Sequence, residues 1–182
     1  MKATGIVRRI DDLGRVVIPK EIRRTLRLRE GTPLEIFTDR EGEIILKKYS
    51  PMVELAAFAG QYAEAMSQAT GLIVCITDRD QVIAVSGGAR KELLQNAISQ
   101  SLERVINERQ TIQAGKDDKS FVRLIDEELE GITAQVVAPI ICEGDAIGAV
   151  AIMSREPRAR FGEMELKLAA TACGFLGRQM ES

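Results

Sequence analysis

The sequence predicts two domains of different class: a small β-rich domain over residues 1–50 and a larger α+β domain with an antiparallel sheet over residues 51–182. Three observations predict this division. Short strand-like runs fill the first fifty residues, whereas helical and strand periods alternate in longer segments afterwards. The charge also changes sign, because residues 1–50 hold twelve basic and eight acidic residues and residues 51–182 hold thirteen and nineteen. A basic first domain followed by an acidic second domain favours contact with nucleic acid through the first domain alone.

The first fifty residues follow the pattern strand, strand, short helix, strand, strand. Apolar runs at 6–7 and 16–18 flank a turn rich in Asp and Gly. Pro19 favours a helix over 20–26, because its fixed φ and missing N–H suit the first helical position. A second hairpin is expected within residues 34–47. Domains this small bury little apolar surface alone, yet apolar residues are dense here, so we expect an intertwined dimer in which two chains share one core.

The segment 14–24, G-R-V-V-I-P-K-E-I-R-R, resembles the AbrB family of bacterial transition-state regulators, as do the flanking residues 4–13 and the strands after the helix. The resemblance implies a swapped-hairpin dimer, in which two chains interleave their hairpins into one β-barrel. It also implies that arginines of the first hairpin and the short helix contact double-stranded DNA. By motif, these arginines are Arg8, Arg9, Arg15, Arg23 and Arg24.

The chemistry of these arginines agrees with that implication. Guanidinium groups bind phosphate oxygens and guanine edges in a bidentate manner. Five per chain, doubled in a dimer, can neutralise ~6–10 phosphates, which predicts steep salt dependence. Few Asn or Gln residues lie nearby, so we expect A·T-rich DNA to be recognised largely by its shape and flexibility. The alternative is that these arginines form a solvated face or pair with Asp11, Asp12 and Glu21.

The second domain is expected to contain helices and strands in an α+β order. An apolar stripe over 53–69 predicts a helix that leaves the first domain directly. The segment 111–119 is polar, and 115–119 is its most loop-like part. The other expected helices are 90–108 and 161–180, and the expected strands are 72–77, 81–85, 121–125, 132–142 and 146–153.

The run 144–152, G-D-A-I-G-A-V-A-I, together with V-A-P-I at 137–140 and F-G-E-M-E at 161–165, is similar to GAF domains. The resemblance implies a small ligand held between sheet and loops. The alternative is a dimerisation module without a pocket. A cyclic nucleotide is not expected, because the corresponding signature is absent. Candidate lining residues are Ser86, Gly87, Gly88, Phe121, Arg123 and Asp126.

Small residues on the two terminal helices of this domain allow close packing. These helices either cover their own sheet or pair between chains, and the second arrangement would join two swapped dimers into a tetramer. The sequence reasoning leaves both open.

The combined resemblances imply a transcriptional activator and repressor of sporulation genes, acting in the forespore. One alternative is an antitoxin-like interaction module, although such proteins usually carry a short disordered tail rather than a second domain. An enzyme is not expected, because the chain has no His and no phosphate loop. The cysteines Cys75, Cys142 and Cys173 are scattered, so we expect a reducing cytoplasm, no metal site and no cofactor. No apolar run approaches the ~20 residues of a membrane span.

Overall fold

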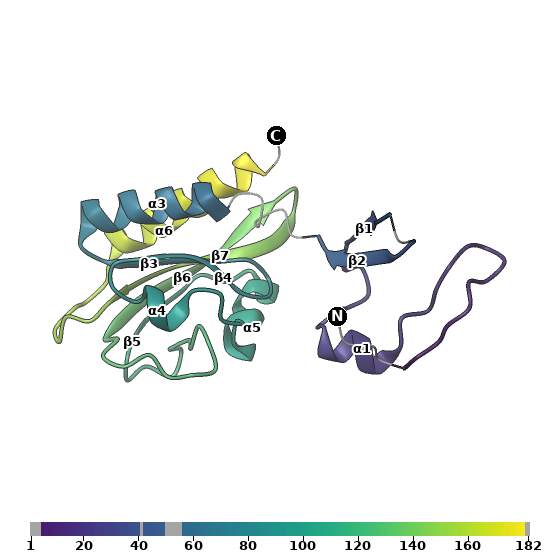
Figure 1. The fold of residues 1–182 in the computed structure, drawn as a ribbon. Coiled ribbons are helices and arrows are strands. Elements are labelled where there is room, and N and C mark those ends of the chain that lie inside the picture. Colours follow the sequence, from purple (N-terminus) through teal and green to yellow (C-terminus); the bar gives the residue numbers. More distant parts are fainter. Residues whose placement is uncertain (1–4, 41, 50–55, 181–182) are drawn as a thin grey trace. The chain divides into compact units, whose positions relative to one another are not determined.

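The computed structural model describes residues 5–40, 42–49 and 56–180. The chain divides into two compact units, Met1–Tyr49 and Ser50–Ser182 (Figure 1). The expected junction at residues 50 and 51 and the expected helical residues 53–55 lie outside the described residues. Each unit is considered by itself below.

The first unit contains one short helix and one β-hairpin. Helix α1 spans Lys20–Thr25, close to the expected 20–26. Strands β1, Leu34–Thr38, and β2, Ile44–Lys48, form an antiparallel pair in which Ile36 lies opposite Leu46. The turn between them is closed by the Asp39 carboxylate, which accepts the Glu43 N–H at 2.8 Å.

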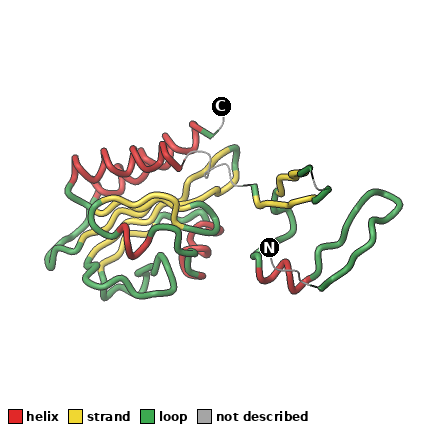
Figure 2. The backbone as a smooth tube through the Cα atoms, in the orientation of Figure 1, coloured by secondary structure: helices red, strands yellow, loops and turns green. Residues whose placement is uncertain are grey.

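Residues 5–19 form a long U-shaped loop without strand structure (Figure 2). The strands expected at 6–7 and 16–18 are therefore not formed in the single chain. Among the described residues, backbone hydrogen bonds across this loop occur only at its tip, where the Asp11 N–H donates to the Arg15 carbonyl at 3.0 Å. A strand exists only when a neighbouring strand satisfies its N–H and C=O groups, and the single chain supplies no such neighbour here.

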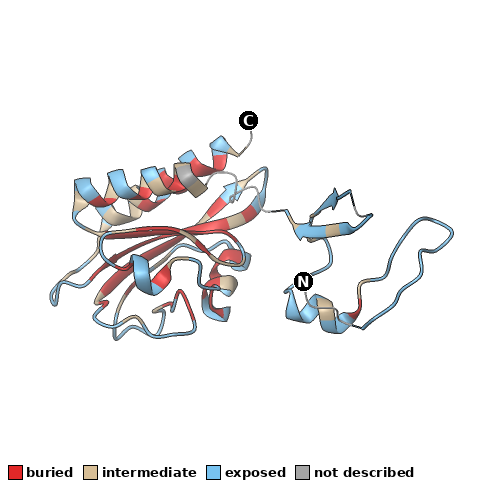
Figure 3. Ribbon diagram, in the orientation of Figure 1, coloured by how far each residue is buried: buried red, intermediate tan, exposed pale blue. Residues whose placement is uncertain are grey.

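The apolar side chains of the first unit are largely exposed (Figure 3). Among its described residues, Pro19 alone is buried. The exposed set comprises Ile6, Val7, Ile10, Leu13, Val16, Val17, Leu26, Ile36, Phe37, Ile44, Leu46 and Tyr49. The first unit thus has the apolar residues of a core but does not bury them within one chain.

The second unit is built on a five-stranded antiparallel sheet in the order β4-β3-β7-β6-β5, which confirms the expected α+β class. Strands β6 and β7 form the long central hairpin, and β4 and β5 are the edges. The strand bounds are β3 Ile73–Thr77, β4 Val82–Ser86, β5 Ile112–Gly115, β6 Ala134–Cys142 and β7 Asp145–Ser154.

Helices cover both faces of this sheet. Helices α3, Ala56–Thr70, and α6, Glu163–Gln179, lie side by side on one face, where Phe175 packs against Phe58 and stacks on Tyr62. The short helix α4, Arg90–Leu93, and helix α5, Gln100–Glu108, lie on the other face. Among the described residues, no helix has both the length and the apolar character needed to cross a membrane.

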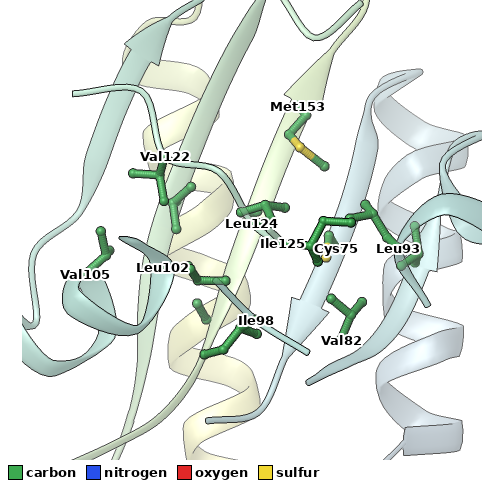
Figure 4. Close-up of a cluster of buried hydrophobic side chains, with 14 of the residues drawn as sticks. Cys75, Val82, Leu93, Ile98, Leu102, Val105, Val122, Leu124, Ile125 and Met153 are labelled. Atoms are coloured by element: carbon green, nitrogen blue, oxygen red, sulfur yellow. The ribbon is translucent and has the colours of Figure 1, made fainter. Parts of the chain in front are cut away.

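The core between α5 and the sheet is closed by a segment that the sequence analysis interpreted wrongly. Residues 121–125 were expected to be a strand, but they form an irregular segment with one isolated bridge, between Ile125 and Ile98, and with Val122, Leu124 and Ile125 buried. Figure 4 shows Leu124 and Ile125 of this segment beside Leu102 and Met153. Burial of these side chains, rather than strand pairing, explains their apolar pattern.

Two further expectations on this face were wrong. The expected helix 90–108 is interrupted, since residues 94–99 are not helical and Gln95 has a φ of 65°. Ser99 caps α5 by accepting the Leu102 N–H at 3.1 Å, and a Ser at this position starts a new helix. No strand was expected in the polar segment 111–119, but it contains β5 at 112–115, an edge strand whose mostly polar or small residues hide it in the sequence; the part expected to be most loop-like, 115–119, forms turns from 116 onward.

Candidate nucleic-acid interface

The tip of the loop 5–19 is organised by Asp11. Its Oδ1 accepts the Leu13 N–H at 3.0 Å and the Arg15 N–H at 2.8 Å. Its Oδ2 accepts the Arg15 Nε–H at 2.8 Å. Gly14, with a φ of 76°, completes the turn in a conformation that few other residues adopt. The backbone and side-chain hydrogen bonds from Arg15 lower the pKa of Asp11 below its ordinary value, because they stabilise the charged carboxylate.

Helix α1 carries the second pair of predicted arginines in its last turn. Pro19 begins the helix and is buried, and its carbonyl accepts the Arg23 N–H at 2.9 Å. The helix ends at Thr25. Arg27 beyond it has a φ of 52°, and the Leu28 N–H donates to the Arg23 carbonyl at 2.7 Å. This is the Schellman arrangement. It fixes the helix end, where positive charge is favoured by the helix dipole.

All five predicted arginines are exposed. The Arg15 guanidinium forms a salt bridge with the Asp11 carboxylate. Pairing with Asp11 was part of the alternative interpretation of these arginines, and it holds for Arg15. Within the part of the chain that the structure describes, no acidic side chain forms a salt bridge with the other four. Their side chains are therefore available to an external anion. These four are Arg8, Arg9, Arg23 and Arg24.

An apolar hollow lies within the same unit. Its wall includes Val16 and Val17 from the loop, Ile22 and Leu26 from α1, and Leu46 from β2. Arg8, Lys47 and Lys48 also contribute to the lining. Lys47 additionally lies over the ring of Phe37, with Nζ 4.7 Å from the ring centroid. The sequence analysis did not single out these two lysines, although their position in a basic pair near the end of the unit was a signal.

The candidate ligand-binding residues of the second unit are not brought together. Phe121 and Arg123 line one cavity beside the sheet, and neither Asp126 nor the segment 86–88 is among its lining residues. Gly87 has a packing role instead. A Cβ atom there would lie 2.6 Å from the Leu72 carbonyl oxygen and 2.8 Å from the Ser67 Oγ, so only glycine allows the end of β4 to approach this segment.

The cavity has one lining residue that the sequence analysis missed. Gln135 lies on β6 within the apolar run 134–142 and is fully buried. A polar residue inside an otherwise buried apolar strand was the available signal, because buried amides require hydrogen-bond partners. Other lining residues not predicted as ligand-binding are Lys116, Glu127, Glu128, Leu129, Ile132 and Met153.

The two units have counterparts among known proteins. Residues 54–181 match the family model described as stage V sporulation protein T C-terminal, transcription factor. Residues 7–53 match the model described as antidote-toxin recognition MazE, bacterial antitoxin. The second unit also superposes on a GAF domain from an Acinetobacter phosphoenolpyruvate-protein phosphotransferase with a TM-score of 0.54, at 14% identity, covering 71% of this chain and 87% of that one. This likeness supports the GAF-like fold.

Individual proteins with similar sequences agree with these family matches. The first 28% of the chain is 65% identical over 51 residues to the transition state regulatory protein AbrB of Bacillus subtilis, and covers 52% of it. Together with the fold, this defines the class of the protein: it is a transcription factor with an AbrB-like N-terminal domain and a GAF-like C-terminal domain.

The whole chain is also 55% identical over 181 residues to stage V sporulation protein T of Bacillus subtilis, covering 100% of this chain and 99% of that protein. The chain therefore belongs to the stage V sporulation protein T family. The family is one of transcription factors, not of enzymes. The predicted resemblances to the AbrB family and to GAF domains are thereby confirmed.

Proposed function

We propose that this chain binds A·T-rich double-stranded DNA through Arg8, Arg9, Arg15, Arg23 and Arg24 and activates or represses sporulation genes from there. The carrying observation is that these arginines are all exposed, and that four of them have no acidic partner within the described residues. Desolvated guanidinium–phosphate pairs form most readily where no internal acid competes. The name of the relative stage V sporulation protein T supports a role in sporulation, and we propose the forespore cytoplasm, at the nucleoid, as the location.

The hydrogen bonds of Asp11 support a specific role for the loop tip. They hold the Arg15 side chain at the tip. This preorganisation reduces the rotamer entropy lost when the guanidinium meets a phosphate or a base edge. Asp11 also offsets part of the positive charge, so Arg15 contributes more through its position than through net attraction.

We infer that the DNA-binding form is an intertwined dimer made by swapping the loops 5–19 between two chains. The occupant of the apolar hollow is then the corresponding segment of a second copy. Two features support this. The apolar side chains of the loop are exposed in a single chain, with Val7 at 87% and Val16 at 52%, and the backbone of the two flanks lacks ladder hydrogen bonds among the described residues. Pairing with a second copy would bury these apolar side chains and supply the missing backbone hydrogen bonds.

The second unit contributes assembly and small-ligand sensing in this proposal. Helix α6 exposes Met164, at 64%, and part of Phe175 beside α3. Exposed apolar side chains on neighbouring helices favour helix pairing between chains. Such pairing would join two swapped dimers into a tetramer. The cavity that Phe121 and Arg123 line is the place proposed for a ligand.

An antitoxin-like interaction module is the second candidate function, favoured by the match of residues 7–53 to the MazE model. In that case the protein would neutralise a partner protein, and DNA binding would be secondary. The folded second unit, with its own core, is the observation against it.

The test uses fluorescence anisotropy of the full chain with an A·T-rich promoter duplex at low and physiological salt. The variant Arg15→Ala/Arg23→Ala is expected to bind at least about tenfold more weakly and to have a shallower salt dependence. The matched control is Arg90→Ala/Arg104→Ala, which removes the same charge from exposed positions of the second unit and is expected to bind almost as wild type.

Equal loss in both double variants would show a general charge effect and contradict the assigned site. Absence of binding by the wild type at low salt would contradict the DNA-binding proposal itself. Sedimentation of the full chain tests the assembly, and a monomer would contradict the swapped dimer.

A further inference from the structure

The cavity beside β6 is a small, partly enclosed space of about 140 Å³. The irregular segment 116–132 covers it, and β6 and β7 form its floor. Figure 4 shows three of its lining residues, Val122, Leu124 and Met153, around the sheet. An apolar cavity of about 150 Å³ in a protein holds a benzene-sized molecule, so this space suits one six-membered ring.

Gln135 lies at the floor of this cavity with an exposed fraction of 0%. Its neighbours across the sheet are Ala114 on β5, with only a methyl group, and Met153 on β7. Neither its Nε2 nor its Oε1 has a hydrogen-bond partner among the described residues. Buried side-chain amides are almost always hydrogen-bonded, so an unpartnered amide on a residue that lines a cavity points to a complementary group from outside the chain.

The other residues that line the cavity limit which chemical groups can bind there. Part of the wall is apolar and buried, formed by Leu124, Ile132 and Met153. The lining also includes two exposed cations, Lys116 and Arg123, and two exposed anions, Glu127 and Glu128. Their formal charges cancel, so the cavity offers no net charge to compensate a charged ligand. Burying an isolated charge there would be costly, which favours an uncharged molecule.

We propose that this cavity binds a small uncharged ring carrying a cis-amide group, such as a lactam or cyclic imide, and that Gln135 holds it through two parallel hydrogen bonds. The Nε2–H donates to the ligand carbonyl and the Oε1 accepts the ligand N–H. The carboxamide and the cis-amide are complementary, and the apolar wall receives the ring. This inference rests on the ligand-sensing part of the proposed function and names its ligand class and its recognition residue.

The experiment is calorimetric titration of the full chain with 2-pyridone, δ-valerolactam and succinimide as probes. The matched control probe is N-methyl-2-pyridone, which has the same ring and carbonyl but lacks the N–H. We expect at least one cis-amide probe to bind and the N-methyl compound to bind about tenfold more weakly or worse, the loss expected for a removed hydrogen bond that leaves Oε1 unpartnered. Equal binding of both pyridones, or no binding of any cis-amide probe, overturns the proposal.

The matched protein variant is Gln135→Met, which keeps the side-chain volume and removes both polar atoms. It is expected to lose probe binding by about tenfold or more while its Tm stays equal to or rises above that of the ligand-free wild type, because the variant buries no unsatisfied amide. A clearly lower Tm would show that the amide is already satisfied in the free protein and would overturn the proposal. DNA binding is measured on the same samples, so that failure of ligand binding with DNA binding intact contradicts this inference alone.

Discussion

The two units of this chain differ in how far they bury their apolar side chains. In the second unit, both faces of the sheet are covered, and side chains such as Val137 and Ile140 are fully buried. In the first unit, side chains of the same kind, such as Val7 and Val17, remain exposed. Composition does not explain the contrast, because both regions are rich in Val, Ile and Leu.

The second unit therefore completes its core within one chain, whereas the first does not. A sheet becomes stable when its strands pair and one face is covered. The second unit meets both conditions with α3, α5 and α6. The first unit has one short helix and one hairpin, so most of its apolar surface stays uncovered in a single chain, and the proposed dimer would cover it with a second copy. The following changes test this contrast, from the largest expected effect to the smallest.

Val16→Asp is expected to have the largest effect, because it places a charge where the proposed dimer buries an apolar side chain. Val16 lies in the loop 5–19 and contributes to the apolar hollow. An uncompensated buried charge costs ~3–5 kcal/mol, so the dimer and DNA binding should both be lost. Sedimentation measures the loss of the dimer and fluorescence anisotropy the loss of DNA binding. The thermal transition of the second unit is expected to be retained.

The matched control is Ile141→Asp, at the partly exposed end of β6 in the second unit. Surface substitutions of this kind usually change stability by about 0.5 kcal/mol or less. A DNA-binding loss as large as that of Val16→Asp would remove the distinction between the two units.

Gly177→Ala should destabilise the second unit by ~1–3 kcal/mol through overpacking. A Cβ at this position of α6 would lie 2.2 Å from the Ile141 carbonyl oxygen, whereas at Gly174 on the same helix it meets nothing within 4 Å. Gly174→Ala is the control and is expected to stabilise by up to ~1 kcal/mol, the difference in helix propensity. Thermal unfolding measures both, and equal effects would contradict the tight packing of α6.

Asp11→Ala should loosen the loop tip and weaken DNA binding less than Arg15→Ala does, because the Arg15 charge remains. Asp12→Ala is the control, since the Leu13 and Arg15 bonds belong to Asp11. The pKa of Asp11 is lowered from 3.8, so the carboxylate's stabilising contribution is present above about pH 3.8 and is lost as the pH falls through the lowered value. Amide chemical shifts of Leu13 and Arg15 followed from pH 6 downward report this, and unchanged shifts would contradict the tip geometry.

Arg109→Gly is expected to have the smallest effect, a stabilisation of about 0.5–1 kcal/mol. Arg109 ends α5 with a φ of 55°, where glycine carries no Cβ penalty. Its contact with Asp145, at 3.9 Å and largely exposed, contributes little. Denaturant unfolding measures the change, with Arg104→Gly inside α5 as a control that should destabilise by a similar amount.

Much of the fold was predictable because it depends on local pattern. The helix after Pro19, the hairpin of β1 and β2, four of the five strands of the second unit (β3, β4, β6 and β7) and the terminal helix follow from periodicity and turn residues. The failures depend on contacts between distant segments. Residues 121–125 are apolar because they cover the core, and a strand-like composition cannot show whether a neighbouring strand is present.

The candidate interface shows the same division. Exposure of the arginines follows from their charge, and a motif of this specificity identifies them. The bond between Asp11 and Arg15 was considered only as an alternative, since the spacing of four residues across a turn permits but does not require it. The ligand-binding candidates Ser86, Gly87 and Gly88 were chosen from their turn composition, which does not reveal what packs beside a turn.

By itself, the sequence determined the family, the basic first unit and the periodic elements, since these depend on residue type and spacing along the chain. Only the tertiary structure decided that helix 90–108 is interrupted, and that Gln135 lines a cavity with no hydrogen-bond partner for its amide among the described residues. It also decided that Gly177 touches the end of β6. The physical reason is that burial and hydrogen bonding at these points depend on residues far away in the chain, whose approach is set by packing rather than by local preference.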